Sequence, residues 1–131
     1  MIEDIQIPKV KNVHIVAIKE WNKEFTAQEW SVYLINDRDD LIATVLVMSR
    51  GESDHQKTST LRHFLGDVKG KSAAKVELIM ENVFGFTNEY LVTFFAEEKL
   101  FEKRFVFDPH SISEKNVVKL PVVEEEGILA K

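Results

Sequence analysis

The sequence contains no cysteine and no long hydrophobic run. Without cysteine the chain can form no disulfide, no thiol nucleophile and no cysteine-ligated zinc site. No stretch approaches the roughly 18 apolar residues of a membrane-spanning helix. The N-terminal segment is acidic and is interrupted by Pro8, so it lacks the basic and apolar regions of a signal peptide. We therefore expect a cytoplasmic protein with no membrane segment.

Basic residues are fewer than acidic ones, since 17 Lys and Arg stand against 22 Asp and Glu and give a net charge of −5. This balance favours solubility and argues against a nucleic-acid-binding surface. A chain of 131 residues, 44% hydrophobic and 30% charged, fits one domain with a core of ordinary size. Nine of its aromatic residues are phenylalanine, and we expect most of these in the core.

Alternation of apolar and polar residues predicts seven β-strands and no long helix. The predicted strands cover residues 13–21, 30–36, 41–49, 58–65 and 73–80, followed by both strands of a hairpin within residues 90–107. Such regular spacing is typical of an all-β, antiparallel two-sheet sandwich. The run at residues 41–49 is almost continuously apolar, which predicts a central strand covered on both faces.

The whole chain, residues 1–131, is predicted to be one sandwich domain with two appendages. Residues 1–11 form an N-terminal arm, and residues 108–131 form a C-terminal tail. Ser111 and Glu114 have the spacing of a capping box, so the tail contains a short helical turn or is extended.

The hairpin at residues 90–107 has two alternating runs on either side of a charged turn. An even number of loop residues places Phe94 and Phe101 on one face, whereas an odd number would bury charged residues beside Phe94. We therefore predict an even loop. Because Glu is unfavourable at the positive φ angles of a two-residue turn, we predict a four-residue loop, residues 97–100, that pairs Ala96 with Phe101.

The other face of the hairpin is half apolar and is the predicted interaction surface. Its apolar members are Leu91, Phe95, Leu100 and Val106. Exposed apolar patches often mark interaction sites. The C-terminal tail is too apolar for a free end, so either the tail or a partner chain is expected to cover this face. Trp21 and Trp30 bracket a polar segment, and they either join the surface by lining a shallow groove or pack in the core.

No pattern in the chain predicts a catalytic, cofactor or metal site. Asp54, His55, His63 and Asp67 could approach one another as metal ligands, but solvated loop residues are the plainer interpretation. The acidic turn at residues 37–40 lacks the calcium-loop pattern, and the Gly-Lys-Ser tripeptide lacks the spacing of a phosphate loop. No serine lies in a nucleophile motif. We therefore predict a protein that is not an enzyme, with no cofactor.

Several segments carry a resemblance to known proteins. VYLIND with LIATVLVMSRG, then LRHFLGDVKGKSAAKVEL and NEYLVTFFAEEKLFEKRFVF, are similar to segments of small bacterial β-sandwich proteins of unassigned function. Relatives of this kind are sometimes labelled as a phenylalanyl-tRNA synthetase subunit, but this chain has no adenylate-binding motif. The chain also resembles an immunoglobulin-like or fibronectin type III-like sandwich without the disulfide. The resemblance implies that fold and no functional residue.

The leading hypothesis from the sequence is a non-enzymatic β-sandwich that binds another protein or itself, in the latter case as a homodimer. One alternative is a small-ligand or carbohydrate-binding module that uses Trp21, Trp30 and Tyr33. Another is an accessory subunit of a larger enzyme or of a nucleic-acid complex.

Overall fold

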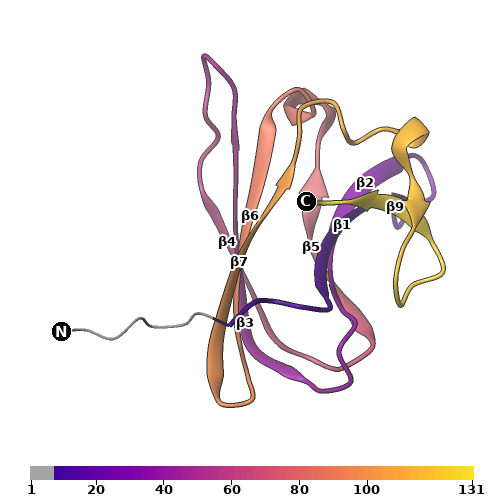
Figure 1. Ribbon diagram of the computed structural model, residues 1–131. Helices are drawn as coiled ribbons and strands as arrows, with labels where there is room; N and C mark the ends of the chain where they lie inside the picture. Colours follow the sequence, from indigo (N-terminus) through magenta and orange to yellow (C-terminus); the bar gives the residue numbers. More distant parts are fainter. Residues whose placement is uncertain (1–7) are drawn as a thin grey trace.

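The computed structural model describes residues 8–131, which form two facing antiparallel β-sheets (Figure 1). The five-stranded sheet contains, in spatial order, β5 (Ser72–Ile79), β2 (Gln28–Asn36), β1 (Val13–Trp21), β9 (Glu126–Leu129) and β8 (Val118–Lys119). The four-stranded sheet contains β4 (Leu61–Val68), β3 (Ile42–Glu52), β6 (Thr87–Ala96) and β7 (Lys99–Phe107). The predicted all-β, two-sheet architecture is confirmed.

The described residues contain nine strands rather than the predicted seven. The seven predicted strands correspond to β1–β7, and the two additional strands are short and lie in the tail. Two three-residue 3-10 turns, η1 (Glu81–Val83) and η2 (Glu114–Asn116), are the helical elements of the described chain. The residue that caps η2 is Ser113 and not Ser111, and its hydroxyl accepts a hydrogen bond from the Lys115 amide. Of the predicted arm, residues 1–7 lie outside the described residues.

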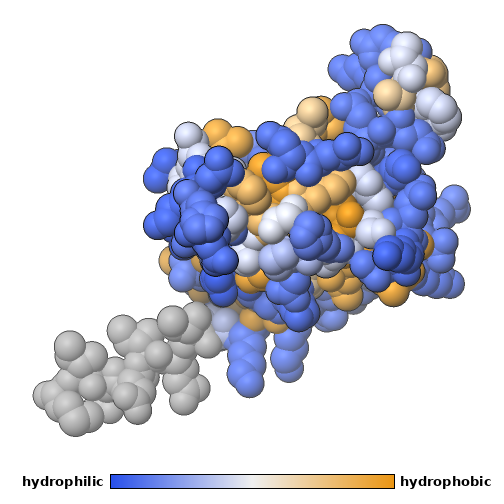
Figure 2. All heavy atoms as spheres, turned by 90° about the horizontal axis from the view of Figure 1, so that it is seen from above, coloured by the Kyte–Doolittle hydropathy of each residue, from blue (hydrophilic) through white to orange (hydrophobic). Residues whose placement is uncertain are grey.

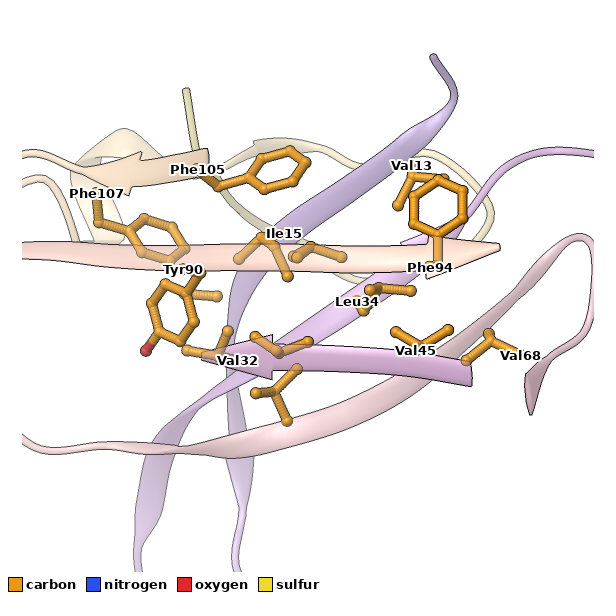
Figure 3. Packing of buried hydrophobic residues seen from close by; sticks show 14 of the residues in the cluster. Val13, Ile15, Val32, Leu34, Val45, Val68, Tyr90, Phe94, Phe105 and Phe107 are labelled. Carbon is orange, nitrogen blue, oxygen red and sulfur yellow. The ribbon is translucent and has the colours of Figure 1, made fainter. Parts of the chain in front are cut away.

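The core lies between the two sheets and is formed by the inward side chains of alternating strands (Figure 3). The four-stranded sheet contributes Val45, Tyr90, Phe94, Phe105 and Phe107, and the five-stranded sheet contributes Val13, Ile15, Val32 and Leu34. All of these are at most 2% exposed. Complete burial of one such side chain contributes about 1.5–3 kcal/mol, so this layer is the main source of stability.

The hairpin β6–β7 has the predicted parity but not the predicted loop. Phe94 pairs with Phe101 on the inward face, as an even loop requires. The turn is only two residues long, because Ala96 pairs with Lys99 and not with Phe101. Glu97 and Glu98 adopt φ angles of 52° and 60°, in the left-handed region that is unfavourable for glutamate.

Cross-strand contacts explain why the shorter turn is adopted. The observed register stacks the Phe94 and Phe101 rings, with centroids 5.1 Å apart, and it places Phe95 opposite Leu100 on the outward face. Glu97 also forms an ion pair with Arg38, with an Nη2–Oε2 distance of 3.1 Å. Aromatic pairs contribute about 0.5–1.5 kcal/mol beyond area burial, which is comparable to the strain of a left-handed residue.

The C-terminal tail packs within the chain, and it closes one open side of the sandwich. Strand β9 pairs with β1, and the Ala130 amide donates to the Ile15 carbonyl at 2.9 Å. Lys131 exchanges two backbone hydrogen bonds, of 3.0 and 3.2 Å, with Val106 on β7. The tail thereby connects an inner strand of one sheet to the edge of the other.

Tail residues also cover the outward face of the five-stranded sheet. Leu120 is 4% exposed and packs with Val16, Ile18 and Ile35, and Val123 lies against the same cluster. Backbone approach is close here, since a Cβ atom added to Gly127 would lie 2.4 Å from the Ala17 carbonyl oxygen. The tail therefore packs tightly against the five-stranded sheet.

Replacing Glu98 with glycine should stabilise the protein, because glycine adopts a positive φ without steric cost. We expect Glu98→Gly to raise the free energy of unfolding by about 0.5–1 kcal/mol in urea titrations. Glu102→Gly, in the middle of β7, is the control and should lower it by about 1 kcal/mol. An equal loss of stability in both variants would contradict the two-residue turn.

Candidate functional site

The predicted interaction surface lies on the outward face of β6 and β7. Phe95 and Leu100 face each other across the hairpin and are 46% and 53% exposed. Leu91 is half-buried on the same face of β6, four residues before Phe95. Val106 is half-buried at the margin, where its backbone is bonded to Lys131. The structure thus brings the four hairpin residues onto one sheet face.

The neighbouring strands β3 and β4 extend this face with residues that the sequence analysis did not select. Leu46 lies between Phe64 on β4 and Thr93 on β6, and Met48 lies beside Leu91. Leu46 and Met48 are half-buried, whereas Phe64 is 69% exposed. We define the outer apolar face by six residues, namely Leu46, Met48, Phe64, Leu91, Phe95 and Leu100.

Strand β3 is covered on only one of its two faces, contrary to the prediction for residues 41–49. Ile42, Val45 and Val47 are completely buried in the core. The alternate residues point outward, where Thr44 is exposed and Leu46 and Met48 are half-buried. The tail does not cover them because it packs on the other sheet. Within residues 8–131, no segment therefore covers the outer apolar face.

An arginine-rich hollow adjoins one end of the outer apolar face. It has a volume of about 320 Å³ and is lined by Met48, Ser49, Arg50, Thr60, Arg62, Glu89, Leu91 and Arg104. Glu89 Oε2 accepts a hydrogen bond from Arg50 Nε at 3.1 Å, and Glu89 Oε1 accepts another from Arg104. These bonds, chiefly the one from Arg104, lower the pKa of Glu89. Three guanidinium groups and one carboxylate leave the hollow with a net positive charge.

The structure does not bring together Trp21, Trp30 and Tyr33, the three aromatic residues of the ligand-binding hypothesis. Trp30 is only 8% exposed and belongs to the core, whereas Trp21 is 55% exposed at the end of β1. Tyr33 lies on the opposite face of β2 and donates hydrogen bonds to both Glu20 oxygens. Burial and this carboxylate raise the pKa of Tyr33 to about 12.

Two hollows occupy the end of the sandwich that is uppermost in Figure 1. The larger, about 530 Å³, is lined by Lys19, Gln28, Glu29, Trp30, Ile79, Met80, Glu81, Asn82 and Phe84. The smaller, about 220 Å³, lies beside the start of β4, and its apolar lining includes Leu61, Leu78, Ile79 and Met80. Figure 2, which looks onto this end, shows apolar surface at its centre with hydrophilic residues around it.

A half-buried carboxylate connects the two sheets on the side opposite the tail. Glu77 on β5 accepts hydrogen bonds from Ser49 Oγ at 3.0 Å and from the Tyr90 hydroxyl at 2.7 Å. His63 Nε2 lies 2.6 Å from Glu77 Oε1, and in the tautomer that protonates Nε2 the imidazole donates a third hydrogen bond to this carboxylate. Burial and the nearby carboxylate raise the pKa of Tyr90, which keeps its hydroxyl a donor.

This cluster does not have the arrangement of a catalytic triad. In a triad the imidazole lies between the hydroxyl and the carboxylate, so that it can take the hydroxyl proton. Here Ser49 donates to Glu77 and not to His63. The cluster therefore joins β3, β4 and β6 to β5 and leaves no activated nucleophile.

The candidate metal ligands are not assembled. Among residues 8–131, no group of three or more His, Cys, Asp and Glu side chains is placed to hold a metal ion. His63 is bonded to Glu77, and Asp67 accepts a hydrogen bond from the Thr44 amide. In the acidic turn, Asp40 pairs with Arg38 and Asp37 pairs with Lys71.

Comparison with known proteins gives no match: no family model, no curated protein and no solved structure is similar to this chain. The structure is that of a small all-β protein with two sheets. No helix in the described part of the chain is long and apolar enough to cross a membrane.

Removing the charge of Glu77 should destabilise the fold. Glu77→Gln replaces an acceptor of three hydrogen bonds with an amide, so we expect the free energy of unfolding to fall by about 1–3 kcal/mol. Glu124→Gln, at an exposed tail position, is the control and should change it by less than about 0.5 kcal/mol. Equal effects of the two substitutions in urea titrations would exclude the connecting role of Glu77.

Proposed function

We propose that this chain is a non-enzymatic protein-interaction module whose interface is the outer apolar face of the four-stranded sheet. The main support for this proposal is strand β3. Its sequence is an almost continuous apolar run, but the described chain buries only one of its two faces. Central strands of this composition are normally covered on both faces. A partner protein supplies the missing cover.

The exposed side chains provide enough apolar surface for a docking site. Phe64, Phe95 and Leu100 are 69%, 46% and 53% exposed, and the half-buried Leu46, Met48 and Leu91 lie around them. Covering each of the three exposed side chains contributes on the order of 1 kcal/mol. Aromatic residues within such a patch are the usual anchors of protein interfaces.

The partner we propose is a different protein whose surface combines apolar and acidic side chains. Three of the four arginines in the sequence, Arg50, Arg62 and Arg104, line the hollow beside the outer apolar face. This concentration is notable because the chain as a whole carries a net charge of −5. Arginine is well suited to bind carboxylates in a bidentate manner. Charge complementarity therefore favours an acidic partner.

The proposal includes an immunoglobulin-like classification of the sandwich. It is supported by the strand pairings β1–β2, β2–β5, β3–β6 and β6–β7, which correspond to the pairings A–B, B–E, C–F and F–G of that fold. Strand β4 takes the position of strand C′. Domains of this architecture commonly act in recognition through sheet faces and edges, which agrees with the proposed interface.

The ligand-binding alternative has weaker support. The hollow lined by Trp30 and Phe84 has a volume suited to a small molecule, about 530 Å³. However, Trp30 is only 8% exposed, so little of its indole ring is available for stacking against a sugar.

Substitutions on the outer apolar face should abolish partner binding without unfolding the chain. We expect Phe95→Asp and Phe64→Ser to weaken binding of the partner captured from native lysate by more than about tenfold, because aromatic anchors dominate interface energies. Phe25→Asn is the matched control, since Phe25 is 75% exposed in a distant turn, and asparagine tolerates its positive φ.

The captured protein is then produced in pure form, and its affinity is measured for each variant. Thermal unfolding verifies that each variant is folded. Equal affinities for the control and the outer-face variants would contradict the proposed interface. The oligomeric state of the isolated chain is measured by light scattering. If the chain is a dimer and Phe95→Asp makes it a monomer, the partner is a second copy of the chain and not a different protein.

A further inference from the structure

We propose that the partner binds by adding an extended segment to the free edge of β4, with acidic side chains beside Arg62 and apolar side chains at the mouth of the adjoining hollow. This inference rests on the proposed function and specifies how the partner docks and what its sequence is like.

The edge of β4 is available for a further strand. Within the described chain, β4 pairs only with β3 and is the outermost strand of the four-stranded sheet. The opposite edge of the same sheet, β7, is bonded to Lys131 of the tail. A strand edge presents unpaired backbone donors and acceptors, and it is a ready template for an extended peptide.

Strand β4 is largely open to solvent, and no segment within residues 8–131 covers its edge. Leu61 and Phe64 are 52% and 69% exposed, and Arg62 is also exposed. A long apolar edge of this kind is normally blunted by charge, by proline or by a covering segment. Gly66, with a φ of 70°, distorts only the second half of the strand. The regular first half, from Leu61 to Phe64, is therefore the proposed docking edge.

The two sides of this edge differ in chemistry, and the difference specifies the added segment. On the outward side are Arg62 and Phe64, next to Arg50 in the arginine-rich hollow. Beside the start of β4, between the sheets, is the hollow of about 220 Å³, where Leu61, Leu78 and Met80 are 52%, 44% and 58% exposed. Successive side chains of a strand point to opposite faces. The fitting segment therefore alternates acidic and apolar residues.

A second copy of β4 is a poor candidate for this position. Antiparallel pairing of two β4 strands in the register centred on Arg62 would place the two guanidinium groups opposite each other, and like charges in opposing positions are destabilising. No ion pair involving Arg62 is found within residues 8–131, which leaves its guanidinium free to bind a carboxylate. A strand from a different protein with an acidic side chain at this position would form an ion pair with Arg62.

The test uses the full chain and three peptide probes that share one length. The first is acetyl-VEVEVEV-amide, the second replaces every glutamate with glutamine, and the third carries N-methylated valines, which cannot donate backbone hydrogen bonds. Binding is followed by amide NMR shifts and by peptide fluorescence anisotropy. The chain variants are Arg62→Gln and the control Lys23→Gln, at an exposed position in the β1–β2 turn.

We expect the glutamate peptide to shift the amide signals of residues 61–64 and to bind about tenfold more tightly than the glutamine peptide, through charge-assisted hydrogen bonds. Arg62→Gln should remove most of this difference, whereas Lys23→Gln should preserve it. N-methylation should abolish binding. Equal binding of the N-methylated peptide would overturn strand addition, and equal binding of the glutamine peptide would overturn the acidic preference.

The outcomes also separate this inference from the proposed function. If the glutamate peptide shifts signals of Phe95 and Leu100 but not those of β4, strand addition is wrong while the outer apolar face stands. If the signals of β4 shift while Phe95→Asp leaves partner binding unchanged, the outer apolar face is wrong and the edge alone is the interface.

Discussion

Backbone hydrogen bonds from the last residues of the chain join the two sheets, and much of the remaining arrangement follows from them. Ala130 bonds to Ile15 in one sheet and Lys131 bonds to Val106 in the other, while Ile128 is buried between them. The two sheets of a sandwich do not hydrogen-bond to each other, so each open side needs its own closure. The tail closes one side, and the Glu77 carboxylate with its three donors closes the other.

Because the tail packs on one sheet only, the outward face of the five-stranded sheet is covered by the described chain and that of the four-stranded sheet is not. Leu120 and Val123 cover Val16, Ile18 and Ile35 on the five-stranded sheet. No comparable segment within residues 8–131 covers Phe64, Phe95 and Leu100 on the four-stranded sheet, and these remain exposed. The same sheet carries the arginine-rich hollow and the free β4 edge. Apolar surface, positive charge and an open strand edge therefore coincide on one side of the molecule.

The sequence predicted the strands and the hairpin parity well because both depend on local alternation and on the cost of burying charge. It predicted the turn length wrongly, since the strain at Glu97 and Glu98 is offset by several long-range contacts together: the stacking of Phe94 on Phe101, the Phe95–Leu100 pair and the Glu97–Arg38 ion pair. The Glu77 cluster was not found, because a glutamate in an alternating strand looks solvent-exposed until Ser49, His63 and Tyr90 are brought to it by three other strands. Phe64 was missed for the same reason, as the outer apolar face needs the pairing of β3 with β4 and β6.

Site-specific photocrosslinking tests the central claim, that the outer apolar face is the interface, most directly. Benzoylphenylalanine replaces Phe95 in one sample and Phe25, a more exposed ring in the β1–β2 turn, in the other. Both are irradiated in lysate of the source cells. Our account predicts that position 95 yields one discrete crosslinked partner and that position 25 yields none. Crosslinks from position 25 with none from position 95 would contradict it.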